Sequence, residues 1–203
     1  MRDPENIRQV LRYRPDYMGF IFHDKSPRYA GNSIEKILDV EFPRYLEKVG
    51  VFVNENIKKI LEIRKRLQLD MAQLHGNETA DLCKSLRAEG LKVVKVFSVG
   101  PDFDFQVMEP YVSFADYFLF DTKGTYYGGN ARPFDWTLID NYPFEKPFFL
   151  GGGIGTDNIG DIRQIRSACF HAVDVNSLVE SAPGLKDPEK LEIFRKQFDK
   201  IRL

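Results

Sequence analysis

The sequence predicts an α/β fold, a (β/α)₈ TIM barrel whose first β-strand is missing from this chain, so that seven strands are expected. Short runs rich in β-branched and aromatic residues alternate along the chain with segments whose apolar residues recur at helical spacing. This alternation has no break at its midpoint, which favours a barrel over a doubly wound sheet. No linker or low-complexity stretch interrupts the 203 residues, so residues 1–203 are expected to form one domain.

The seven predicted strands are apolar runs of the kind that is buried on both faces of a parallel sheet. A barrel begins with a strand, yet a capped helix is predicted from Asp3, before the first of these runs. We therefore expect Met1 to be an internal methionine of a longer natural chain. The predicted strands are residues 17–22, 49–53, 71–74, 93–99, 117–120, 147–150 and 172–175.

Helices are predicted between the strands, where apolar residues lie three or four positions apart. Side-chain oxygens that can cap a helix, or a proline suited to its first turn, precede several of them. A further helix is predicted within 101–117, and the irregular segment 122–134 is predicted to be a functional loop. The helical sets are Ile7/Val10/Leu11, Ile34/Ile37/Leu38, Ile57/Ile60/Leu61, Leu82/Leu86, Ile159/Ile162/Ile165 and Leu191/Phe194/Phe198/Ile201, with start signals at Asp3-Pro4, Ser33, Asn77, Thr156 and Asp187-Pro188.

Composition excludes several classes of protein. The 29 Lys and Arg residues balance 30 Asp and Glu, so no strongly basic face for nucleic acid or an anionic membrane is expected. Two cysteines, Cys83 and Cys169, are too few for a disulfide framework, and no apolar run approaches the roughly 20 residues that span a bilayer. We expect a cytoplasmic protein that has no nucleic-acid or membrane partner. No Walker loop or G-x-G-x-x-G motif supports a nucleotide cofactor.

Polar residues at the carboxyl ends of the predicted strands are the candidate site, because these ends form the mouth of a barrel. Asp121 ends an apolar strand, where burial disfavours the charged form of a carboxyl and suits a general acid; a helix cap or an ion-pair partner is the alternative. Arg28, in a loop, can hold a carboxylate in a bidentate fork or simply be solvated. His75 follows another strand and is expected to be a hydrogen-bonded structural residue more often than a catalytic one.

Two glycine-rich or polar segments near the end of the chain suggest a phosphate site. The triplet Gly151, Gly152 and Gly153 offers backbone amides, although a tight turn explains such a triplet equally well. The segment 174–177, which includes Asn176 and Ser177, closes the last strand, where barrels often bind phosphate.

These strand-end strings, in this order, resemble the phosphoribosylanthranilate isomerases, a (β/α)₈ family of tryptophan biosynthesis. The likeness covers nearly the whole chain. The matching pieces are Gly-Phe-Ile-Phe at 19–22, Lys-Ser-Pro-Arg-Tyr at 25–29, Val-Gly-Val-Phe-Val-Asn-Glu at 49–55, Gln-Leu-His-Gly at 73–76, Phe-Asp-Thr at 120–122, Phe-Asp-Trp at 134–136, Gly-Gly-Gly at 151–153, Ala-Val-Asp-Val-Asn-Ser at 172–177 and Pro-Gly-Leu-Lys-Asp at 183–187.

The resemblance implies an Amadori rearrangement of N-(5-phosphoribosyl)anthranilate to 1-(2-carboxyphenylamino)-1-deoxyribulose 5-phosphate, a ketol isomerisation without a cofactor. An acid protonates the ribose ring oxygen, and a base then removes the proton from C2. By resemblance Asp121 is the acid, and Arg28 binds the anthranilate carboxylate. Gly152, Gly153 and the backbone around Asn176 and Ser177 bind the phosphate.

Three departures from the family pattern limit that transfer. The family's general base is a cysteine in a first strand of the type Lys-Ile-Cys-Gly, directly before the segment that 1–7 resembles, so low activity is expected and His75 is the first candidate for a substitute base. Leu178 stands where the family usually has glycine. The loop at 128–133 reads Gly-Gly-Asn-Ala-Arg-Pro in place of Gly-Thr-Gly-Lys-Thr.

The absent strand also leaves the runs 17–22 and 172–175 with unpaired edges, which predicts marginal stability and a monomer or an edge-paired homodimer. Two other functions stay open at this point. One is an isomerase of a related aminated ribose phosphate, and the other is a catalytically impaired barrel that only binds a phosphosugar.

Overall fold

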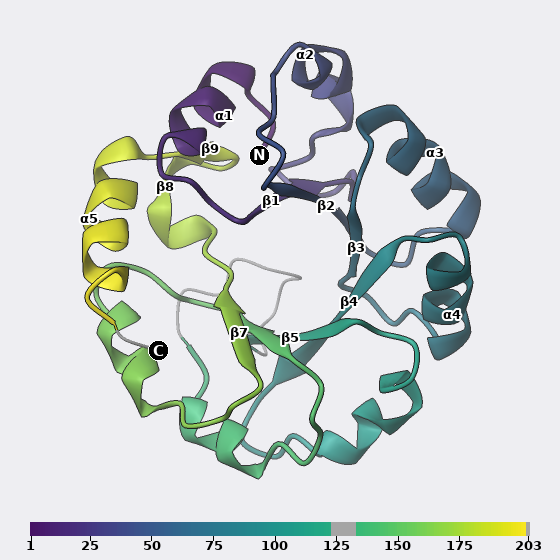
Figure 1. The fold of residues 1–203 in the computed structure, drawn as a ribbon, viewed down its shortest axis with the longest axis vertical. Coiled ribbons are helices and arrows are strands. Elements are labelled where there is room, and N and C mark those ends of the chain that lie inside the picture. The colour runs from purple at the N-terminus through teal and green to yellow at the C-terminus, as the bar shows by residue number, and fades with distance from the viewer. Residues whose placement is uncertain (123–132, 202–203) are drawn as a thin grey trace.

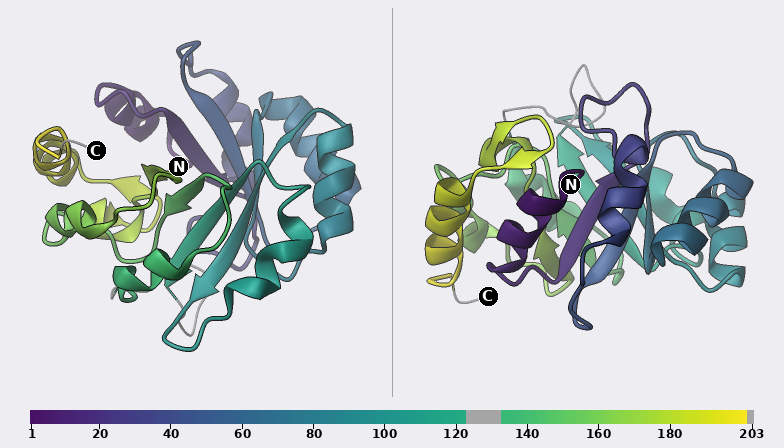
Figure 2. Two further views of the ribbon diagram at one scale, coloured as in Figure 1. Left: turned by 60° about the horizontal axis from the view of Figure 1, so that its bottom comes forward. Right: turned by 90° about the horizontal axis from the view of Figure 1, so that it is seen from above.

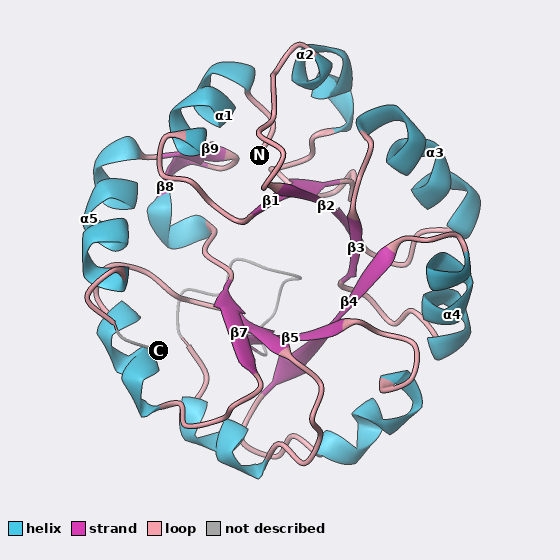
Figure 3. Ribbon diagram, viewed as in Figure 1, coloured by secondary structure: helices cyan, strands magenta, loops and turns pink. Residues whose placement is uncertain are grey.

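A computed structural model describes residues 1–122 and 133–201 of the chain. Seven parallel strands, hydrogen-bonded in sequence order, form one curled sheet surrounded by helices (Figures 1 and 3). The prediction of seven strands in a TIM-type fold is confirmed. The strands are β1 (Tyr17–Ile21), β2 (Glu47–Phe52), β3 (Met71–Leu74), β4 (Lys92–Val99), β5 (Tyr117–Thr122), β6 (Phe148–Leu150) and β7 (Phe170–Val173).

The sheet is open between β1 and β7, which pair only with β2 and β6 respectively among the described strands. Side chains cross this opening at the amino ends of the strands, where a hydrogen bond of 2.8 Å joins Tyr17 Oη to His171 Nε2. The Tyr17 ring also packs edge-to-face on Phe149 of β6. At the middle of β1, the amine of Met1 donates to the Gly19 carbonyl at 2.6 Å.

The helices lie on the outer face of the curled sheet, as Figure 2 shows in two further views. Five are α-helices, and the other five helices among the described residues are 3₁₀ helices. The α-helices are α1 (Pro4–Leu11), α2 (Ile34–Leu38), α3 (Ile57–Leu67), α4 (Ala80–Ala88) and α5 (Pro188–Phe198); the 3₁₀ helices are η1 (Gly31–Ser33), η2 (Phe105–Tyr111), η3 (Trp136–Asn141), η4 (Ile159–Gln164) and η5 (Ser177–Val179).

Some of the predicted helix starts need correction. Asp3 and Asp187 cap α1 and α5 as expected, with side-chain oxygens that accept backbone amides. Thr79, and not Asn77, caps α4, and Ser33 makes no capping bond. The set expected to begin at Thr156 forms the 3₁₀ helix η4, because three- and four-residue spacing suits either kind of helix.

Alternation along the strands gives the sheet two apolar layers. On β4, Val94 and Val96 belong to a small cluster with residues of β2, β3, β5 and β6, which fills the inside of the barrel. Val93 and Phe97 belong instead to the large core between the sheet and the helices. The side chain of any strand residue can therefore be assigned to the inside or the outside by its position in this alternation.

A short antiparallel hairpin, β8 (Glu180–Ala182) and β9 (Leu185–Lys186), follows β7 and was not predicted from the sequence. It is joined to α1, because Asn6 Nδ2 donates to the Lys186 carbonyl and Asn6 Oδ1 accepts the Lys186 amide, both at 2.7 Å. The hairpin and α1 therefore lie side by side at the opening of the sheet (Figure 1). In the described part of the chain, no helix has both the length and the apolar character needed to cross a membrane.

Candidate active site

Asp121 lies at the carboxyl end of β5, and its side chain points into the barrel. It follows Tyr117 and Leu119 at alternate positions of that strand, and Leu119 belongs to the inner cluster. Only 6% of the residue is exposed. Asp121 Oδ1 accepts the Thr122 amide at 2.8 Å, and Oδ2 lies 3.0 Å from His75 Nε2. The buried strand thus presents one carboxyl oxygen to the mouth of the barrel, beside an imidazole.

His75 follows β3, and its contact with Asp121 joins the loop after β3 to the end of β5, 46 positions further along the sequence. Its backbone amide donates to the Phe52 carbonyl at 2.8 Å, which continues the pairing of β2 and β3 past the end of the strand. The side chain is 12% exposed. The partner of the imidazole is the candidate acid itself, and the structural role expected for His75 from the sequence stays a prediction.

Arg28 lies in the loop after β1 and is held by a residue that the sequence analysis did not consider. Its Nε and Nη2 donate to the Glu180 carboxylate at 2.7–3.1 Å. Glu180 also accepts from Lys186 Nζ at 3.0 Å. Burial alone would raise the pKa of Glu180, but the bonds from Arg28 and the charge of Lys186 hold this pKa below its usual value.

This pairing occupies one edge of the guanidinium group. Among the described residues, Arg28 Nη1 has no hydrogen-bond partner. Arg28 is therefore fixed in direction by Glu180 while part of its fork remains open to a second anion. Arg28 and Glu180 are 152 positions apart in the sequence, so their pairing can be seen only in the fold.

The glycine triplet follows β6 and forms a tight loop. Gly152 and Gly153 have φ angles of +79° and +73°, where residues with a Cβ are strained. A Cβ at Gly152 would also collide with Thr122 and with Asp121 Oδ1. Neither amide of these two glycines donates to another described residue. The triplet therefore brings open backbone donors close to the candidate acid.

Asn176 and Ser177 lie after β7, at the start of η5, near the same loop. Lys186 Nζ donates to the carbonyl of Asn176 at 2.9 Å and to its Oδ1 at 2.6 Å, so the Asn176 side chain is already engaged. Leu178 packs against the glycine loop, since a Cβ at Gly155 would lie 2.8 Å from Leu178 Cβ. The absence of a side chain at Gly155 gives Leu178 its space.

Asp174 is a second carboxyl at the mouth, which the sequence analysis placed only within the predicted phosphate segment. Burial raises its pKa, and the neighbouring charge of Asp121 raises it further, against the opposing charges of Lys186 and His75. Its position directly after β7 is the sequence feature that could have identified it as a candidate site residue. Two carboxyls with different surroundings at one mouth are typical of acid–base sites.

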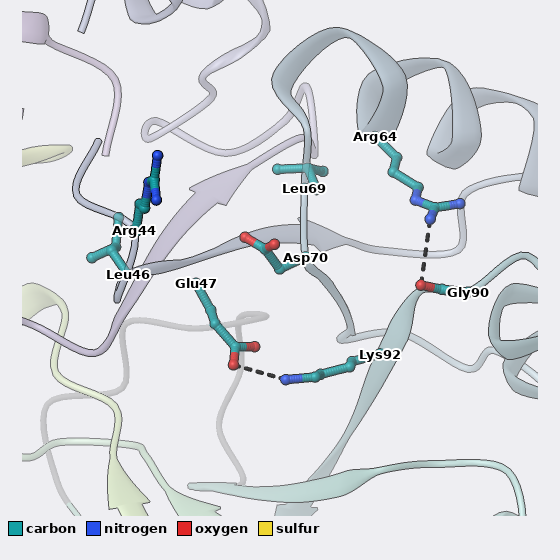
Figure 4. Close-up of a pocket in the computed structure, with 8 residues that line it drawn as sticks. All are labelled: Arg44, Leu46, Glu47, Arg64, Leu69, Asp70, Gly90 and Lys92. Carbon is teal, nitrogen blue, oxygen red and sulfur yellow. Dashed lines mark hydrogen bonds and ion pairs between the residues drawn. The ribbon is translucent and has the colours of Figure 1, made fainter. Parts of the chain in front are cut away.

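The opposite end of the barrel has a hollow of its own (Figure 4). It measures about 410 Å³ and is lined by charged residues at the amino ends of β2 and β4, among them Glu47 and Lys92. Lys92 Nζ donates to Glu47 Oε1 at 2.7 Å, and Arg64 is bonded to the backbone of Glu89 and Gly90. Lys92 is thus paired with Glu47, and Arg64 is held by backbone carbonyls, as expected for the face of a barrel that stabilises the fold.

Metal binding receives no support from the described ranges 1–122 and 133–201, where no cluster of three His, Cys, Asp or Glu side chains could hold an ion. The predicted functional loop and its unusual residues at 128–133 fall largely within 123–132, outside the described residues.

Residues 1–197 match the family described as N-(5′-phosphoribosyl)anthranilate (PRA) isomerase. Among curated relatives, the N-(5′-phosphoribosyl)anthranilate isomerase of Parabacteroides distasonis is 40% identical over 199 residues, which cover 97% of this chain and 90% of that protein. The enzyme of the same name from Thermotoga maritima is 38% identical over 184 residues, which cover 89% and 86% respectively.

Solved structures agree with this similarity. A phosphoribosyl anthranilate isomerase in complex with reduced 1-(o-carboxyphenylamino)-1-deoxyribulose 5-phosphate is 33% identical, with a TM-score of 0.83 and coverage of 99% of this chain and 96% of that chain. The isomerase structure from Thermotoga maritima is 35% identical, with a TM-score of 0.86 and the same coverage.

Proposed function

The chain belongs to the family of N-(5′-phosphoribosyl)anthranilate isomerases, enzymes of tryptophan biosynthesis, and on this premise we propose which of its residues carry the reaction. Asp121 is the general acid that protonates the ribose ring oxygen. Arg28 binds the anthranilate carboxylate. The loop with Gly152 and Gly153, together with the backbone at Asn176 and Ser177, binds the 5′-phosphate. By resemblance the family's general base is a cysteine in a strand of the type Lys-Ile-Cys-Gly, and these 203 residues contain no such motif, so we give that role to no residue here.

The position of Asp121 carries the proposal. An acid must lie where water is excluded and must still reach the substrate. Asp121 meets both needs, because the residue is 6% exposed and its Oδ2 faces the mouth beside His75. We assign His75 to substrate binding and to orienting this carboxyl, since its Nε2 is within hydrogen-bond distance of Oδ2.

The binding groups suit the two charged ends of the substrate. The ribose phosphate carries an anion at one end and the anthranilate carboxylate at the other. Open amides at the glycine loop suit the phosphate, and the open Nη1 of Arg28 suits the carboxylate. Both groups hold the reacting ribose over the end of β5. This pattern favours the isomerase over the two alternatives, a binding-only barrel and an enzyme for an amine without a carboxylate.

Partners and location follow from the same premise. The substrate is a small phosphosugar, and the protein acts in the cytoplasm without nucleic acid or membrane. One solved relative is described as monomers generated from a dimeric isomerase of Thermotoga maritima, with 34% identity and a TM-score of 0.79. We propose that this chain is likewise a monomer or a homodimer, with the edges of β1 and β7 as the surfaces for pairing.

The substitution Asp121→Asn tests the assignment of the acid, with Asp116→Asn as its matched control. Asp116 lies just before the other end of the same strand, where its Oδ2 accepts the Val93 amide at 2.8 Å. We expect Asp121→Asn to lower kcat about 10²–10⁴-fold, because proton transfer by a positioned acid contributes that much. Binding of the reduced product analogue should persist. Equal turnover of Asp121→Asn and the wild type would refute the assignment.

A further inference from the structure

A buried ion pair lies behind the loop that carries His75. Lys95 Nζ of β4 and Glu78 Oε2, in the loop after β3, are 3.0 Å apart. We propose that Lys95 and Glu78 are positioning residues for the isomerase reaction, which fix the His75 imidazole against Asp121. The proposal rests on the roles given above to Asp121 and His75.

The burial of this pair is unusual for charged groups. The side chains of Lys95 and Glu78 are 3% and 1% exposed. Lys95 alternates with Val94 and Val96, which fill the barrel, so its side chain points outward into the layer under the helices. A lysine in that layer is costly unless every donor is paired.

Lys95 donates hydrogen bonds to backbone carbonyls on both sides of His75. Its Nζ donates to the Leu74 carbonyl at 3.2 Å and to the Gly76 carbonyl at 2.7 Å. The Glu78 carboxylate accepts the Gly76 amide at 2.9–3.0 Å. The peptide groups before and after His75 are thus both bonded to the pair, and the direction in which the imidazole leaves the backbone is set by them.

The pair also ties this loop to its neighbours. Glu78 Oε1 accepts the Asn54 amide at 2.8 Å, and Asn54 Oδ1 in turn accepts the Asn77 amide at 2.7 Å. From the next loop along the barrel, Tyr111 Oη donates to the Glu78 carbonyl at 3.0 Å. The loops after β2, β3 and β4 are therefore joined through Glu78.

Folding alone does not account for this network. Apolar residues of similar volume often stabilise a protein as well as a buried ion pair does, or better. What an apolar pair lacks is directional bonds to the carbonyls of Leu74 and Gly76. Because a shift of about 1 Å in an active-site group can lower a rate about 100-fold, such bonds matter most next to a reacting carboxyl.

The test uses the double variant Lys95→Met/Glu78→Gln, in which no buried charge is left unpaired and the glutamine oxygen remains an acceptor for the Asn54 amide. The matched control is Lys92→Met/Glu47→Gln, the ion pair at the other end of β4. Far-UV circular dichroism and thermal unfolding establish that both are folded. Steady-state kinetics and the imidazole signals in ¹H–¹⁵N NMR are then compared with the wild type, and the chain has only three histidines to assign.

We expect the Lys95/Glu78 variant to lose about 10- to 100-fold in kcat, with KM within about threefold of the wild type and with shifted His75 ring signals. The Lys92/Glu47 control should change neither. Unshifted His75 signals, or a kcat within about twofold of the wild type, would overturn the proposal. Full turnover of Asp121→Asn would refute the acid instead, and the ring signals would still measure whether the pair positions His75.

Discussion

The two ends of the barrel carry the same kinds of residue and use them differently. Strand β4 has Lys92 at its amino end and Lys95 further along, each paired with a glutamate. The side chain of Lys92 is 49% exposed and that of Glu47 is 29% exposed, whereas the side chains of Lys95 and Glu78 are almost entirely buried. Charges at the amino end neutralise one another near water. Charges at the carboxyl end are desolvated, and they fix loops around a carboxyl and a histidine.

Single substitutions at the two lysines should give the largest difference in stability. Lys95→Met leaves the Glu78 carboxylate buried without its cation, which costs about 3–5 kcal/mol of unfolding free energy. Lys92→Met removes an exposed partner and should cost about 0–1 kcal/mol. Urea unfolding of the two variants measures both values. Equal losses would mean that the two ends do not differ in the way described.

Substituting one arginine at each end of the barrel gives a second comparison, in which the affinity for the product analogue is measured. Arg28→Met should weaken binding of the reduced product analogue about 10- to 100-fold, since a hydrogen bond to a charged group is worth about 1.5–3 kcal/mol. Arg64→Met, in the hollow at the amino end, should leave affinity unchanged. Isothermal titration calorimetry provides the measurement. An analogue without the carboxylate should bind Arg28→Met and the wild type alike, and a difference there would assign Arg28 another role.

Substitution of Asp174 should give the smallest effect, a change in unfolding free energy that depends on pH. Its pKa in the folded protein is raised above the ordinary value of 3.8, so the native state holds this proton more tightly than the unfolded chain does. The ionised carboxyl therefore destabilises the fold at neutral pH, and this penalty disappears as the pH falls below 3.8. Asp174→Asn should raise the unfolding free energy at pH 7 and have no effect at pH 3. Destabilisation at pH 7 would contradict this.

The strands could be predicted from the sequence because each contains a short run of mostly apolar residues between helical segments. The kinds of helix could not, since the apolar spacing of Ile159 and Ile162 suits a 3₁₀ helix as well as an α-helix. For the site, Asp121 and His75 are recognisable at the ends of their strands. Their contact depends on how the carboxyl ends of β3 and β5 lie relative to each other in the barrel.

The partners of the site residues were the part that sequence reasoning missed. Glu180 orients Arg28 from a hairpin 152 positions away, and no local pattern indicates that pairing. Lys95 did leave a signal, because it is the one charged residue within the predicted strand 93–99. A lysine in a strand buried on both faces requires a buried anion, and a search for that anion would have led to Glu78.

The central claim is that the carboxyl end of the barrel binds the substrate and carries out the reaction. Titration of the reduced product analogue into ¹⁵N-labelled protein, followed by amide chemical shifts, tests it directly. The account predicts the largest shifts at Gly152, Gly153 and Ser177 and at the loop of His75, with none around Glu47 and Lys92. Shifts concentrated in the hollow at the amino end would contradict it.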